Sequence, residues 1–180
     1  MAMQSALDVV DFNASPFFSA REWPSADALG GVNVLKHMTP GIIRTLFDLR
    51  ASVPEDHRMH PSPAWGAHVR PYGDSRHSIS WDGTPRLSDA TDFFMDWEHV
   101  FYAWEQAQRI KEIGGLGIYF DTKLGGALTP MLHIDNRPER LLWVRYTEMT
   151  KQRYIYHADN PAVFHSIMGR YADMYARGAR

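Results

Sequence analysis

The stretch GGLGIYFDTKLGGALTPMLHIDNRPERLLWVRY (residues 114–146) decides the fold of this chain. It contains three apolar runs bounded by turn residues: LGIYF (116–120), MLHID (131–135) and RLLWVRY (140–146). The turns lie at Gly125-Gly126 and at Arg137-Pro138. Short apolar runs separated in this way are typical of β-strands. The stretch therefore predicts three strands in the second half of the chain.

Helices are expected on both sides of these strands. Pro40 after a Thr39 cap predicts a helix over 40–51, and the apolar spacing predicts a longer one over 96–113. Pro161 after Asn160 predicts a third helix over 161–176. Together with a further strand at 90–95 and a short one at 65–70, this order of elements predicts an α+β fold, a small antiparallel sheet flanked by helices.

The length of 180 residues suits one domain with a sizeable core. We expect an irregular segment over 1–16, the main domain over 17–146, and a C-terminal extension with one helix over 147–180. The net charge of −2 gives no basic field for nucleic acid, and no apolar run is long enough to span a bilayer. No secretory signal is visible at the N-terminus, and the lack of cysteine excludes thiolate zinc sites.

Three residues have metal-ligand chemistry, and two of them lie in apolar surroundings. Asp92 is placed between Ala90-Thr91 and Phe93-Phe94, and His133 between Leu132 and Ile134; His77 precedes them. A buried carboxylate needs a partner, and a metal ion is one of the few that offsets its desolvation. Two imidazoles and one carboxylate match an open catalytic zinc site with a fourth position for water. The sequence therefore predicts zinc at His77, Asp92 and His133.

Asp135 lies two residues after His133, so both side chains leave a strand on the same face. Two roles follow from this placement. Asp135 is either the general base that takes a proton from water, or the group that accepts a hydrogen bond from the imidazole and orients it.

The order of these motifs resembles the zinc D-Ala-D-Ala carboxypeptidase and murein endopeptidase superfamily, whose core is shared with the hedgehog signalling domain. The matching segments are Ser75-Arg76-His77, Ser88-Asp89-Ala90-Thr91-Asp92 and His133-Ile134-Asp135, with FSAREW (18–23), LFDLR (46–50) and GGLGIYF (114–120) around them. The resemblance covers roughly residues 17–145.

Two departures from the family pattern stand out. His77 and Asp92 are 15 residues apart, against about seven in the family, and Ser88 replaces the glycine of the motif, which makes Asp89 a competing ligand. Many relatives carry the catalytic acid where this chain has Pro130. Asp135 is the expected substitute as base, with Asp121 behind it.

The resemblance implies a zinc metallopeptidase that hydrolyses amide bonds in peptidoglycan stem peptides, as a phage endolysin, a virion-associated wall hydrolase or a bacterial enzyme. It implies a basic residue before the first ligand that binds a substrate carboxylate, for which Arg70 and Arg76 are the candidates, with solvated loop arginines as the alternative. Ser75 is expected to donate a hydrogen bond to the substrate peptide or to a group beside the ligands, and phage virion proteins are the further partners. The location follows the role: host cytoplasm before release to the wall, or the virion. The alternative is a catalytically decayed virion component that keeps the fold and binds the cell wall.

The other histidines carry a weaker signal. His57 and His60, together with His68, offer the donors of a second metal site in a proline-rich loop. His99 lies on the predicted helix 96–113 and is expected to pack or to face solvent.

Overall fold

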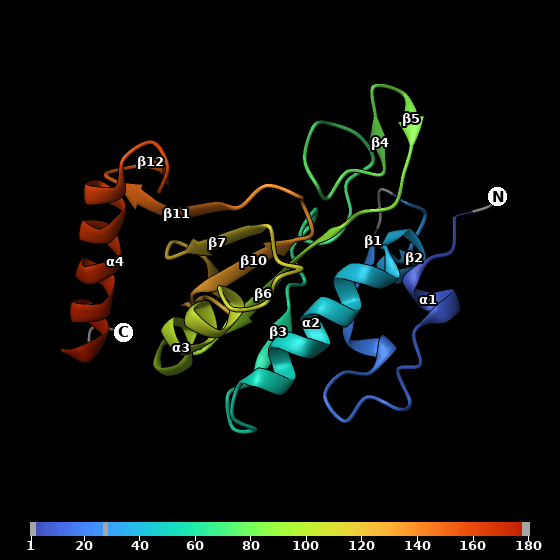
Figure 1. The fold of residues 1–180 in the computed structure, drawn as a ribbon, viewed down its shortest axis with the longest axis horizontal. Helices are drawn as coiled ribbons and strands as arrows, with labels where there is room; N and C mark the ends of the chain where they lie inside the picture. The colour runs from blue at the N-terminus through green and yellow to red at the C-terminus, as the bar shows by residue number, and fades with distance from the viewer. Residues whose placement is uncertain (1–2, 27–28, 178–180) are drawn as a thin grey trace.

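The computed structural model describes residues 3–26 and 29–177, which are organised around a mixed six-stranded sheet (Figure 1). The strand order across this sheet is β12-β11-β7-β10-β6-β3. In chain order the strands are β3 (Met59–Pro61), β6 (Ala90–Met95), β7 (Gly115–Tyr119), β10 (Met131–Asp135), β11 (Leu141–Glu148) and β12 (Lys151–Tyr156).

The α+β composition is confirmed, but the prediction of a small antiparallel sheet is wrong. The sheet has six strands, and β7 and β11 run parallel, while the other neighbouring pairs are antiparallel. The parallel pair arises because residues 136–140 carry the chain past the end of β7. Both Asp135 at the end of β10 and Leu141 at the start of β11 are register partners of Gly115.

Three helices of the described residues are longer than two turns, and two of them carry the expected caps. They are α2 (Pro40–Ser52), α3 (Trp97–Ala107) and α4 (Pro161–Ala176). Thr39 Oγ1 accepts a hydrogen bond from Ile42 N at 3.3 Å, and Asn160 Oδ1 accepts one from Val163 N at 3.1 Å. These side chains satisfy amides that the first helical turn leaves free.

Shorter elements complete the described part of the chain. They are the helix α1 (Ala6–Val9), the 3-10 helices η1 (Ala20–Glu22) and η3 (Val34–His37), and the strand pairs β1–β2 (Ser25–Ala26, Val32–Asn33), β4–β5 (Ser80–Trp81, Thr84–Pro85) and β8–β9 (Lys123–Leu124, Ala127–Leu128). None of the helices in residues 3–26 and 29–177 has the length and apolar character that crossing a membrane requires.

The two faces of the sheet bury different clusters. One face packs on α2, α3 and α4 and belongs to the main core, with Ile118, Leu132 and Val144 fully buried. The opposite face carries a smaller apolar cluster of Phe94, Tyr119, Met131 and Trp143. Because side chains alternate along a strand, this second face also holds Asp92, His133 and Asp135.

The C-terminal segment is part of the same core. The expected boundary at residue 146 falls inside β11, and the following residues form β12, which pairs with β11 from Trp143↔Tyr156 to Glu148↔Lys151. Figure 1 shows α4 beside β11 and β12, and its Phe164, Ile167 and Tyr171 are buried in the main core. The segment therefore extends the domain rather than following it.

Two predicted elements differ from those observed. The helix expected over 96–113 ends at Ala107, because tight turns follow, with Arg109 N bonded to Gln106 O and Ile113 N to Ile110 O. These turns bring Ile113 into the core. The strand expected at 65–70 is a loop, in which Gly66 has a φ of +76°, and the edge strand β3 lies earlier.

Candidate metal centre

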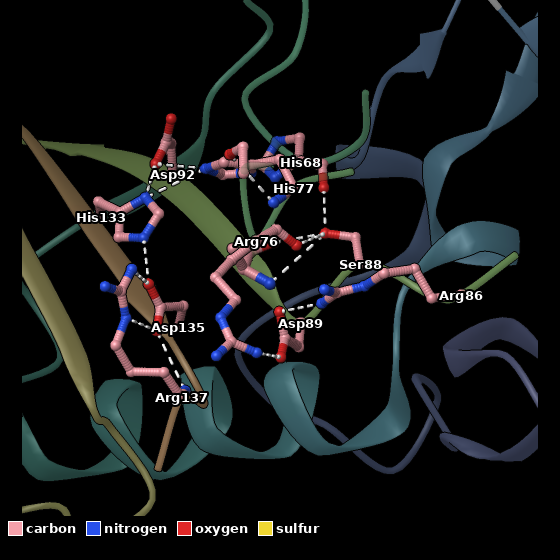
Figure 2. A network of polar contacts seen from close by, with 12 residues as sticks. His68, Arg76, His77, Arg86, Ser88, Asp89, Asp92, His133, Asp135 and Arg137 are labelled. Atoms are coloured by element: carbon pink, nitrogen blue, oxygen red, sulfur yellow. Dashed lines mark hydrogen bonds and ion pairs between the residues drawn. The ribbon is translucent and has the colours of Figure 1, made fainter. Parts of the chain in front are cut away.

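His77, Asp92 and His133 meet on the face of the sheet that the helices leave uncovered. Asp92 on β6 and His133 on β10 are direct register partners, and His77 comes from the loop before β4. His133 Nδ1 lies 2.8 Å from Asp92 Oδ1 and 3.1 Å from His77 Nε2, and the third distance, His77 Nε2 to Asp92 Oδ1, is 3.6 Å. Figure 2 shows the three side chains pointing toward one another. They form a buried group that could hold a metal ion.

The loop that carries His77 is tied to its neighbours by backbone hydrogen bonds. Arg70 N donates to His77 O at 2.7 Å, and Ile79 N donates to Arg70 O at 2.9 Å. The residues that lengthen the spacing from His77 to Asp92 form the β4–β5 hairpin, which turns at Asp82 and Gly83, both with positive φ. The long spacing therefore adds a surface hairpin without separating the ligand-bearing side chains.

The three side chains are almost completely removed from solvent, with exposed fractions of 3% for His77, 5% for Asp92 and 4% for His133. His77 Nδ1 is buried and has no hydrogen-bond partner among the described residues. Buried polar groups without partners are costly, and such groups gather at functional sites. The donor set and its burial fit a divalent ion held by two nitrogens and one carboxylate oxygen.

Asp135 contacts the Nε2 side of the His133 ring, whereas Asp92 and His77 lie on its Nδ1 side. Its Oδ2 is 2.9 Å from His133 Nε2, and it also accepts hydrogen bonds from Arg137 N, Nε and Nη2 at 3.1, 2.7 and 2.5 Å (Figure 2). The carboxylate is fully buried. Because His133 donates Nε2–H to Asp135, its Nδ1 is the nitrogen left to bind a cation. This geometry favours the orienting role of Asp135 over the role of general base.

Burial and the contacts among His77, Asp92, His133 and Asp135 set the protonation of these side chains. Burial lowers the pKa of His77 to about 3, so this ring is neutral at neutral pH. Burial opposes a charge on His133, but its hydrogen bonds to Asp135 and Asp92 raise its pKa to about 9. Burial also opposes the charges of Asp92 and Asp135, and the contacts with the histidines and Arg137 nevertheless hold both carboxyl pKa values below their usual range. The proton on His133 Nδ1 occupies the position that a bound cation would take.

Glycines on β7 make room for this arrangement. A Cβ on Gly115 would overlap the Asp135 carboxylate, and a Cβ on Gly117 would overlap the Trp143 indole. The Trp143 ring can therefore lie across β7 and reach the His133 ring, with 4.9 Å between the centroids. The glycines of GGLG therefore contribute to the site because they lack side chains, which leaves room for Asp135 and Trp143.

A pocket of about 260 Å³ opens beside the group, with Asp92 in its wall. Its other charged lining residues are all cationic: Arg70, Lys123 and Arg145. Arg145 lies over the Tyr119 ring at 4.1 Å from its centroid, and its Nε donates to Asp121 Oδ1 at 2.8 Å. Three cationic side chains therefore line the pocket beside the Asp92 carboxylate.

The other residues expected at the site are distributed unevenly. Arg70 lines the pocket, whereas Arg76 forms an ion pair with Asp89 at 3.1 Å and Ser75 Oγ accepts a hydrogen bond from His77 N at 3.3 Å. Asp89 is also paired with Arg86 at 2.8 Å, so it does not compete with Asp92.

Asp121, the second candidate for the base, is held by Arg145 Nε and Thr147 Oγ1. His68 bonds to Thr91 Oγ1 and Ser62 O, both at 2.8 Å, and burial lowers its pKa to about 4. It is therefore a buried neutral residue that supports the strand carrying Asp92.

Three charged residues at the site were not predicted from the sequence. Arg137 had a detectable signal, because His133, Asp135 and Arg137 alternate and so share one face of the chain. Lys123 and Arg145 had none, since strands distant from one another in sequence bring them to the pocket.

No protein-family model, curated protein or solved structure matches the chain in comparisons with known proteins. The geometry of the site is thus the basis on which a function can be proposed.

Proposed function

We propose that the protein is a zinc-dependent peptidase that hydrolyses amide bonds in the stem peptides of bacterial peptidoglycan. The observation that carries the proposal is the convergence of three buried ligand atoms, from His77, Asp92 and His133, next to a pocket of about 260 Å³ that Asp92 lines. A metal ion held by such a cluster beside a concave site can activate water for hydrolysis.

His77 Nε2, Asp92 Oδ1 and His133 Nδ1 would hold the zinc ion. When bound, zinc supplies Lewis-acid chemistry, polarising a carbonyl and making water a nucleophile at neutral pH. Asp135 fixes the orientation of the His133 ring through Nε2–H, and Arg137 fixes Asp135. Asp135 is therefore a positioning residue in this proposal.

The pocket supports a substrate that carries a carboxylate. Arg70, Lys123 and Arg145 line it, and arginine binds carboxylates through two parallel hydrogen bonds. Stem peptides of peptidoglycan contain free carboxylates next to their amide bonds. In the reaction, the C–N bond of the amide breaks, the oxygen of one water molecule joins the acyl carbon, and its protons go to the new carboxylate and amine.

Mass spectrometry of purified peptidoglycan after digestion tests this function and names the bond. The expected result is a set of peptide fragments with intact glycan strands, in which the two products of each cut together weigh one water more than the parent peptide. The His133→Ala variant is the control and should release none of them. Cleavage of the glycan, or equal release by the variant, would refute the proposal.

A second candidate function is a cell-wall-binding protein that has lost cleavage. It is favoured by the arrangement around Asp135, since both of its oxygens are engaged by His133 and Arg137, and Asp92 is the only acidic residue that lines the pocket among the described residues. Co-sedimentation with purified cell walls, without release of any fragment by zinc-loaded protein, would support this candidate instead.

A further inference from the structure

A second cluster of metal-binding side chains lies away from the first one. Asp56 and His57, in the turn after α2, meet His99 in the first turn of α3. Ligand atoms of the three residues all lie within 4.8 Å of one another. The sequence had suggested His57 with His60 and His68, but His60 is exposed on β3 and His68 is buried beneath Thr91.

The turn that presents Asp56 and His57 is fixed by a buried arginine. Arg50 donates hydrogen bonds to the carbonyl oxygens of three consecutive residues, at 3.3, 3.1 and 2.7 Å; these residues are Val53, Pro54 and Glu55. His57 N adds a bond to Pro54 O at 3.0 Å. The backbone before the two ligand candidates is therefore held in one conformation, which lowers the entropy cost of binding an ion.

The two imidazole rings are held against each other. The His57 and His99 centroids are 3.6 Å apart with 16° between the ring planes, and the Tyr102 ring meets His57 edge-on at 5.4 Å. His99 is anchored by its position in α3, where its N donates to Asp96 O at 3.0 Å. Contacts from two elements thus bring together two imidazoles that are 42 positions apart in the sequence.

Neither nitrogen of the His57 ring has a hydrogen bond to a protein atom in the described part of the chain. Nδ1 is buried without a partner, and Nε2 lies 3.9 Å from Asp56 Oδ1, too far for a hydrogen bond. A gap of this size is close to the spacing of roughly 3.3 Å between two ligands of one tetrahedral ion. The exposed Asp56 side chain has the freedom to close the difference.

We propose that Asp56, His57 and His99 form a second metal site that binds a first-row divalent ion such as Zn²⁺ and ties the turn after α2 to α3. Two imidazoles and a carboxylate suit Zn²⁺, Co²⁺ or Ni²⁺ rather than Ca²⁺ or Mg²⁺. Solvent fills the remaining positions, because Asp56 is exposed. An ion that binds only the folded chain stabilises it, so this site would act on stability. The inference is independent of the proposed peptidase function.

The test is the zinc content of untagged protein after equilibrium dialysis, measured by elemental mass spectrometry at pH 7.5. Wild-type protein and the matched control His60→Gln should bind two ions, and His99→Gln should bind one. The melting temperature of His99→Gln should also rise less on addition of Zn²⁺ than that of wild type. Two ions in His99→Gln, or an unchanged thermal shift, would overturn the proposal.

Two further variants keep the test independent of folding and of the first site. Asp56→Asn changes only an exposed atom, and it should weaken the second ion at least tenfold in a Zn²⁺ titration; unchanged affinity would count against the site. If wild type binds one ion that His99→Gln loses and His77→Gln keeps, the second site stands and the first fails. If His77→Gln loses that ion and His99→Gln keeps it, the second site is refuted alone.

Discussion

The two faces of the central sheet differ in how they use space. On the face that packs on the helices, Leu116, Ile118 and Leu132 are fully buried in the main core. On the other face, Gly115 and Gly117 have no side chains, and the Asp135 carboxylate and the Trp143 indole occupy the space where a Cβ would lie. One face is held by apolar contacts, whereas the other combines a smaller apolar cluster with a network of charged and polar side chains around His133.

Because of this difference, the residues of β10 that stabilise the fold and those that form the site alternate along the strand. On β10, Leu132 and Ile134 point to the core, while His133 and Asp135 point to the site. A change on one side of the strand should therefore alter unfolding, and a change one residue later should alter metal binding and activity. The following predictions test this separation, from the largest expected effect to the smallest.

Removing a ligand candidate should have the largest effect. On the proposed function, His77→Ala should reduce the release of peptidoglycan fragments to background, because one of the three proposed ligand atoms is lost. The far-UV circular dichroism of the variant should match that of metal-free wild type, since His77 lies on a loop outside the main core. Cleavage by His77→Ala at the wild-type rate would show that His77 is not part of the catalytic site.

Truncating the core face should lower stability and leave the metal content unchanged. Leu132 is fully buried among apolar residues, so Leu132→Ala should reduce the free energy of unfolding by about 2–5 kcal/mol. Urea denaturation of the zinc-loaded and metal-free variant gives this quantity. A variant that lost zinc at the His133 site while remaining folded would show that the two faces are not independent.

Adding a side chain to a glycine of β7 should disturb the site by overpacking it. Gly115→Ala places a methyl group where the Asp135 carboxylate lies, and His133 and Arg137 prevent that carboxylate from moving away. Overpacking of this kind costs about 1–3 kcal/mol. We expect a matching fall in unfolding free energy together with weaker zinc binding, measured by competition with a chelating dye. Wild-type affinity in this variant would contradict the packing account.

Asp135→Asn separates the two roles of this carboxylate. As a positioning residue it should keep the fold and weaken zinc affinity or activity by about 10–100-fold. As a general base it would instead lower the rate by about 10²–10⁴ with zinc occupancy unchanged. The measurement is zinc affinity and turnover on the same sample, and we expect the first pattern.

The smallest effect is expected from a glycine outside both faces. A Cβ on Gly169 in α4 would meet no other atom, and the position is exposed. Because alanine favours a helix over glycine, Gly169→Ala should raise the free energy of unfolding by up to about 1 kcal/mol without affecting zinc. It is the matched control for Gly115→Ala, and a loss of stability here would show that the helix packs differently.

Part of this structure could be predicted from local sequence because its causes are local. The strand β10 and the helix α4 were predicted with their observed bounds, since apolar periodicity and the Asn160 cap with Pro161 define them. The grouping of His77, Asp92 and His133 was predicted because Asp92 and His133 lie inside apolar runs, where a polar group needs a partner, and because the order of the motifs pointed to His77.

The remainder depends on contacts between distant segments. The edge strand β12 has the sequence KQRYIY, whose polar, largely exposed residues give little apolar signal. The parallel pairing of β11 with β7 follows from a crossover that no local pattern encodes. The meeting of His57 with His99 likewise depends on how the turn after α2 packs against α3. Such contacts are decided by the tertiary fold.

The central claim is that the buried group of His77, Asp92 and His133 makes the protein a metal-dependent peptidase. The most direct test measures fragment release from purified peptidoglycan by wild-type protein before metal removal, after removal with a chelator, and after zinc is restored. The account predicts that release stops on removal and returns with zinc, whereas His77→Ala stays inactive throughout. Release by the fully metal-free protein, or none by the zinc-loaded protein, would contradict it.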